Sequence, residues 1–176
     1  IAGAVWWDGG GIQRVVPWWM AFLVLTIAAE RLEIIRFQRF SKGDALSGAL
    51  VLLLLLLGPA VGLSDLDTGT RLLGAGLLTG PLWLVRRDIA LRTVRTDGLA
   101  RFAAVGVLMA YVWLVVSGVL LVTVGVRGGL EYDAVVHTFF IGFVFGAIIA
   151  HEPIIAPAVT GLHFAYTPVL YVPLAV

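Results

Sequence analysis

The sequence predicts an all-α, polytopic membrane protein, a bundle of about six transmembrane helices with both termini on the outer side. Of its 176 residues, 60% are hydrophobic and only 13% are charged, and the mean hydropathy is +1.01. A soluble domain of this length cannot bury so much apolar surface. Several apolar runs approach the roughly 20 residues that a helix needs to span a bilayer. Runs such as Leu50–Leu57 lack the alternation that strands of a membrane barrel show.

Each span follows from an apolar run bounded by charged residues, Gly or Pro. We expect one membrane domain over residues 1–176, in which residues 1–16 are an interfacial lead-in rich in Trp. The first span continues into a charged helical extension, and the basic stretch 86–95 is suited to lying on the membrane surface. Pro153 ends the fifth span or opens the sixth. The predicted spans are 17–29, 45–63, 70–85, 99–125, 132–150 and 154–176.

The basic residues predict the orientation. Nine of the twelve Lys and Arg residues follow the first and third spans: Arg31, Arg36, Arg39, Lys42, Arg86, Arg87, Arg92, Arg95 and Arg101. By the positive-inside rule these two connections are cytoplasmic. The N-terminal lead-in is then outside, and six spans return the C-terminus to the outside.

All three histidines lie in the last third of the chain, at His137, His151 and His163. In an α-helix, fourteen residues turn through about 1400°, so His137 and His151 share a face about 21 Å apart. An imidazole is costly to bury in a bilayer without a partner, so each is a candidate ligand of haem or a metal ion. His163 is expected in the middle of the sixth span, on one face with Thr160 and Tyr166. The alternative is that the histidines are interfacial or hydrogen-bonded within the core.

Residues beside the histidines predict supporting roles. Asp133, one turn before His137, is placed to accept the second imidazole N–H and orient the ring, or is an ordinary interfacial acid. Glu152 is either solvated or a proton-handling carboxylate at the inner face. Gly142 and Gly146 form a small-xxx-small pattern that permits close helix packing, or that makes room for a flat cofactor.

Two resemblances extend these expectations. The fourteen-residue spacing resembles that of the two haem-ligating histidines on one helix of cytochrome b, although that arrangement needs four histidines on two helices. The run 132–158, together with 29–33, 88–95 and 111–113, resembles the bacterial NnrS-like haem–copper membrane proteins. That resemblance implies haem b or copper held by His137, His151 and His163, and a longer parent of about a dozen spans in the bacterial cytoplasmic membrane.

These patterns predict a haem- or metal-binding membrane protein, a subunit of a respiratory or redox assembly that takes part in electron transport. The alternative is a cofactor-free structural subunit of a larger membrane complex, and a small transporter is a third candidate. The lack of cysteine excludes Cys-ligated iron–sulfur clusters. The net charge of +1 gives no field for nucleic acid. The expected partners are the lipid bilayer and other membrane subunits, or the rest of a longer chain.

Overall fold

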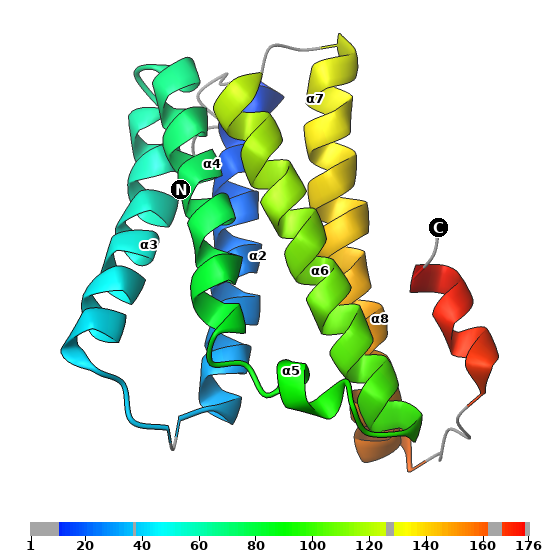
Figure 1. Ribbon diagram of the computed structural model, residues 1–176. Coiled ribbons are helices and arrows are strands. Elements are labelled where there is room, and N and C mark those ends of the chain that lie inside the picture. Colours follow the sequence, from blue (N-terminus) through cyan, green and yellow to red (C-terminus); the bar gives the residue numbers. More distant parts are fainter. Residues whose placement is uncertain (1–10, 37, 126–128, 162–166, 175–176) are drawn as a thin grey trace.

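The computed structural model describes residues 11–174, apart from residue 37 and the segments 126–128 and 162–166, and its regular elements are all helices. The long helices run alternately up and down in a bundle (Figure 1). In chain order the helices are α2 (Ile12–Ile34), α3 (Lys42–Val61), α4 (Leu66–Val85), the short α5 (Ala90–Thr93) and α6 (Gly98–Thr123). A continuous helical stretch follows, made of α7 (Gly129–Val136), the π-helix η1 (His137–Phe145) and α8 (Gly146–Thr160), and then the 3₁₀ helix η2 (Pro168–Leu174).

Four helical stretches of the described chain are long and apolar enough to cross a membrane: α2, α3, α6 and residues Gly129–Pro153. This confirms the predicted all-helical class, and it gives four candidate membrane spans among the described residues where the sequence predicted six. The connection after α2 and the helix α5 lie at the same end of the bundle (Figure 1). We call it the basic end, because the nine basic residues counted above belong to these two connections and their flanking helices.

Helix α4 lies between α3 and α6 and touches both through glycine. A Cβ atom added to Gly69 would lie 2.4 Å from the Cα atom of Gly62, the residue that directly follows α3. A Cβ atom added to Gly118 in α6 would lie 2.6 Å from the backbone nitrogen of Leu78 in α4. The three backbones therefore approach as closely as small residues allow, which is the usual way in which helices associate in a membrane.

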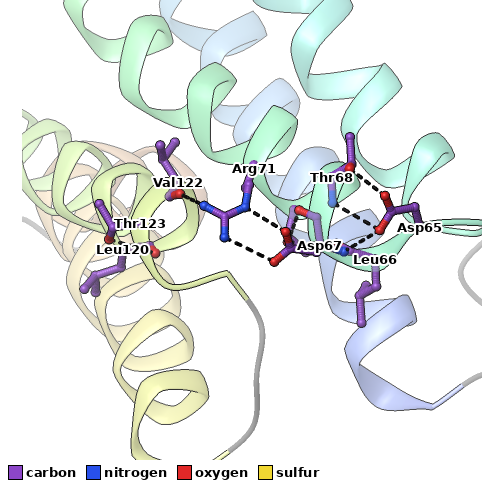
Figure 2. Close-up of polar contacts among 9 residues, drawn as sticks. Asp65, Leu66, Asp67, Thr68, Arg71, Leu120, Val122 and Thr123 are labelled. Carbon is purple, nitrogen blue, oxygen red and sulfur yellow. Dashed lines mark hydrogen bonds and ion pairs between the residues drawn. The ribbon is translucent and has the colours of Figure 1, made fainter.

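Polar contacts hold the start of α4 at the end of the bundle opposite the basic end (Figure 2). The carboxylate of Asp65 accepts hydrogen bonds from the backbone N–H groups of Asp67 and Thr68, which caps the helix. The Arg71 guanidinium pairs with Asp67 and donates to the backbone carbonyl of Val122 in α6. These contacts tie the first turn of α4 to the last turn of α6.

The predicted boundary between the fifth and sixth spans is wrong. Residues 154–160 continue α8, with Pro153 and Pro157 inside the helix, and the helix ends at Gly161, whose φ is +73°. Each proline removes one N–H donor, and membrane helices tolerate this because neighbouring groups satisfy the freed carbonyls. Glycine adopts this left-handed conformation without strain, so the helix stops there. Pro168–Leu174 is a short 3₁₀ helix and not part of a span.

The first span also differs at its start. Helix α2 begins at Ile12 and carries Pro17 in its interior, whereas the sequence predicted an interfacial lead-in through residue 16. The charged extension after residue 29 is helical as far as Ile34, as predicted. The helices α3, α4 and α6 match the bounds of the second, third and fourth predicted spans to within four residues. Of these three helices, α3 and α6 are candidate membrane spans and α4 is not.

Candidate functional site

A group of four side chains, three of them buried and one half-buried, joins the helices at the basic end. Arg31 comes from the last turns of α2, Asp88 from the turn after α4, Tyr111 from α6 and His151 from α8. Arg31, Asp88 and Tyr111 are 7%, 6% and 6% exposed. We call these four residues the polar cluster.

Asp88 is the centre of the polar cluster because four donors point at its carboxylate. Its Oδ2 atom accepts from Arg31 Nε at 2.9 Å and from the Tyr111 hydroxyl at 2.6 Å. Its Oδ1 atom accepts from the backbone N–H of Ala90 at 2.8 Å and from Arg31 Nη2. The two parallel bonds from the guanidinium form the bidentate geometry in which Arg pairs best with a carboxylate.

Local structure places each partner. Asp88 bonds the N–H two residues ahead, an Asx turn that leads the chain from α4 into α5. The side chain of Tyr111 reaches this turn because long side chains on a helix point back toward its N-terminus, which for α6 is the basic end. Arg31 reaches it from the last turn of α2, the turn in which cations are favoured by the helix dipole.

Hydrogen bonding keeps Asp88 ionised. Burial alone would raise the pKa of its carboxyl group, but the hydrogen bonds from Arg31, Tyr111 and the Ala90 N–H outweigh burial and lower that pKa below its ordinary value. A buried ion pair of this kind contributes little net stability over an apolar pair. Removing one partner is costly, because the other charge is then buried alone.

Both ring nitrogens of His151 have a hydrogen-bond partner, and Nε2 joins the ring to the polar cluster. Its Nδ1 atom lies 2.6 Å from the carbonyl oxygen of Ala147, and its Nε2 atom lies 3.4 Å from Arg31 Nη1. A carbonyl and a guanidinium allow only one assignment, with the proton on Nδ1 and Nε2 accepting from Arg31. Nε2, the nitrogen that would hold a metal, therefore faces the Arg31 guanidinium, and the predicted role of His151 as a haem or metal ligand stays a prediction.

His137 has a different setting. It is exposed at the start of the π-helix, and its Nδ1 atom lies 2.7 Å from the backbone carbonyl oxygen of Asp133. The carbonyl, and not the predicted carboxylate of Asp133, is therefore the hydrogen-bond partner of the ring. This bond fixes the proton on Nδ1 and leaves Nε2 as the nitrogen that would hold a metal.

The structure does not bring the predicted ligands together. His137 and His151 lie fourteen residues apart on one helical stretch, roughly 20 Å at an α-helical rise. The arithmetic that put them on one face also fails, because residues 137–145 form a π-helix, which winds more slowly per residue. His163 and Tyr166 lie outside the described residues. Within the described part of the chain, no three His, Asp or Glu side chains gather as a metal site.

The remaining predicted residues have structural or surface settings. A Cβ atom added to Gly142 would lie 2.5 Å from Trp113 Cγ, so this glycine packs closely against α6, as predicted. Gly146 has no such contact, since its nearest neighbour would lie at 3.9 Å. Glu152 is exposed and lines a cavity of about 440 Å³ between α2 and α8, together with Glu30 and His151.

Sequence reasoning missed three members of the polar cluster. It assigned Arg31 to a solvated helical extension and Asp88 to a basic surface stretch. One signal was present, namely that Asp88 is a lone acid followed by Ile89 and Ala90, among arginines and just after a span. Its partner Arg31 lies 57 residues earlier, so no local pattern could connect the two.

Comparison with known proteins places the chain in a family. The family model for a domain of unknown function, DUF8744, matches residues 1–176. The chain belongs to the DUF8744 family. No curated protein and no solved structure shows significant similarity to this DUF8744 chain.

Proposed function

We propose that this DUF8744 chain is a structural module of a larger assembly in the bacterial cytoplasmic membrane, with its basic end on the cytoplasmic side. Its role is to hold neighbouring subunits, or further helices of a longer chain, in place. The observation that carries this proposal is the 3.4 Å contact between Arg31 Nη1 and His151 Nε2. This contact makes the histidine part of a hydrogen-bond network that joins α2, α6, α8 and the turn after α4.

The surface of α3 suits such a module. Its outer face carries Leu46, Leu50, Leu53 and Leu57, which are 43% to 74% exposed and repeat every three or four residues. This stripe faces away from the bundle and is open to lipid or to a partner helix. The helix itself is firmly held, because its other side packs on α4 through Gly58, and Gly62, which directly follows the helix, packs on Gly69 of α4.

A haem- or metal-binding function is the second candidate, and His137 supports it. Its exposed imidazole has Nδ1 bonded to a carbonyl oxygen, the arrangement that commonly orients a metal-bound histidine. One such ligand is not a complete site, so a second would come from His163, from another chain or from the rest of a longer chain. Haem b held in this way would supply electron transfer, and copper would do the same.

The experiment that separates the candidates is a visible spectrum and metal analysis of the protein purified in mild detergent from haem- and copper-replete cells. The structural module predicts a colourless preparation without stoichiometric metal, which retains a stoichiometric membrane partner. A Soret band, or bound copper, that is lost in His137→Ala would overturn it in favour of the second candidate.

A matched pair of variants tests the role of His151. His151→Gln keeps a carbonyl that can accept from the Arg31 guanidinium, whereas His151→Ala leaves that contact empty. If the His151 ring acts only as a hydrogen-bond acceptor between helices, the Ala variant loses roughly 1–2 kcal/mol of unfolding free energy, and the Gln variant recovers most of that loss. Equal behaviour of the two variants in stability would contradict the structural role.

A further inference from the structure

An apolar cavity of about 550 Å³ lies between α2 and the pair formed by α3 and α4. Its walls are apolar side chains, such as Ala28 and Leu32 of α2 and Ala49 and Leu52 of α3, and Tyr111 of α6 also lines it. Its volume is in the range of small-molecule sites, about 300–1,000 Å³. In a membrane such a space is filled by an apolar molecule, because water has no polar partner on these walls.

The cavity has the depth of one leaflet. The lining residues of α3 run from Ala45 to Leu55, ten residues or about 15 Å of helix. The hydrocarbon core of a bilayer is about 30 Å thick. Because α3 starts at the basic end, the cavity extends from that end to about the middle of the bilayer, which is the space occupied by an acyl chain of that leaflet.

A frame of packed aromatic and charged side chains lies at the end of the cavity near the basic end of the bundle. The Phe40 and Trp83 rings stack with centroids 6.2 Å apart, and the Arg87 guanidinium lies 5.9 Å from the centre of the Phe40 ring. Trp83 Nε1 donates to the backbone carbonyl of Asp44 at 3.1 Å, and Arg87 pairs with the carboxylate of Asp44. Both rings line the cavity, so these contacts hold its entrance in shape.

The rim beside this frame is positively charged. Arg39 directly precedes Phe40, Lys42 lies three residues before Ala45, and Arg86 follows Leu84 by two residues. All three side chains are exposed. Two carboxylates beside these cations are already paired, Asp44 with Arg87 and Glu33, which follows the lining residue Leu32, with Arg36. Basic pockets between helices on the cytoplasmic side of a membrane are suited to anionic lipid headgroups.

We propose that this cavity binds one acyl chain of an anionic phospholipid, whose headgroup lies over Arg39, Lys42 and Arg86. The apolar walls and the leaflet depth account for the chain, and the exposed cations account for the phosphate. A neutral apolar molecule would use the walls but gain nothing from the rim. A polar solute would find partners at the rim and none inside.

The test is native mass spectrometry of the full chain released from nanodiscs that contain phosphatidylglycerol and phosphatidylcholine in equal amounts. We expect one retained phosphatidylglycerol per chain. In Arg39→Gln/Lys42→Gln the preference for it should fall, by about fivefold for each removed charge. Arg95→Gln/Arg101→Gln removes two exposed charges of the same end away from the cavity and should leave the preference unchanged.

A second set of variants fills the cavity with an aromatic side chain. Ala49→Phe places a ring in it from α3 and Ala28→Phe does so from α2, and either should abolish retention of the lipid. Ala60→Phe adds the same ring to an exposed site on α3 outside the cavity and is the matched control. If one filled variant does not fold by circular dichroism, the other serves.

Three outcomes would overturn the proposal. The first is equal retention of the two lipids by the unaltered chain, and the second is unchanged retention in a folded, filled variant. The third is the release of a neutral apolar molecule, such as a quinone, from the protein purified from its native membrane in place of a phospholipid.

Discussion

Asp88→Ala is the sharpest perturbation of the polar cluster, because it removes the acceptor of four hydrogen bonds at once. The Arg31 side chain, 8% exposed, would be left as an uncompensated buried charge. Breaking a buried pair in this way costs about 3–5 kcal/mol. At 1.36 kcal/mol per decade this is roughly two to nearly four decades in the unfolding equilibrium constant.

A compensated variant distinguishes the loss of charge balance from the loss of contacts. In Arg31→Met/Asp88→Leu/Tyr111→Phe both charges and the hydroxyl are absent, so no charge is buried alone. Apolar replacement of a complete buried pair is often close to neutral. Since the Ala90 N–H still loses its acceptor and His151 Nε2 loses its donor, we expect a net loss of about 2 kcal/mol, smaller than that of Asp88→Ala.

The assay is unfolding by SDS in mixed detergent micelles, followed by circular dichroism and Trp fluorescence. Glu33→Ala is the control, because it breaks an ion pair to Arg36 whose side chains are 65% and 57% exposed. That pair should contribute less than about 1 kcal/mol. The reasoning fails if Asp88→Ala is as mild as the control, or if the triple variant is less stable than Asp88→Ala.

Three further predictions rest on close packing, on titration and on an unpaired hydroxyl. Gly118→Ala should destabilise the bundle by about 1–3 kcal/mol or more, because its Cβ atom would lie 2.6 Å from the backbone nitrogen of Leu78. Gly146→Ala, whose nearest neighbour would lie at 3.9 Å, should be neutral or stabilising by up to about 1 kcal/mol, and equal losses in an SDS titration would refute the contrast. The pKa of Asp88 is lowered on folding, so its stabilisation is complete above the ordinary Asp pKa of about 3.9 and is lost as pH falls toward the lower folded pKa. Unfolding free energies measured from pH 6 down to about 3 should therefore decline more steeply in the wild type than in the triple variant. The buried Ser117 hydroxyl has no hydrogen-bond partner among the described residues, so Ser117→Ala should cost nothing or stabilise by up to about 1 kcal/mol, and a loss above that would contradict it.

The last third of the chain shows where local pattern misled. The pair Pro153 and Pro157 predicted a break between two spans, and both residues lie inside α8. The α-helical spacing of His137 and His151 predicted a shared face, and a π-helix lies between them. The first prediction took proline as a helix end, and the second took the winding as regularly α-helical. Contacts with α6, such as Gly142 against Trp113, accompany the irregular winding.

Hydrophobicity by itself predicted the all-helical class and the candidate membrane spans, including the bounds of α3 and α6, because the cost of burying a polar backbone in lipid depends only on the local run of residues. The charged connections also predicted which residues gather at one end. Only the tertiary structure decided that Asp88 and Arg31, far apart in the chain, form a buried pair, and that His151 belongs to it. Such a pair depends on how separate helices pack, and no local propensity encodes that.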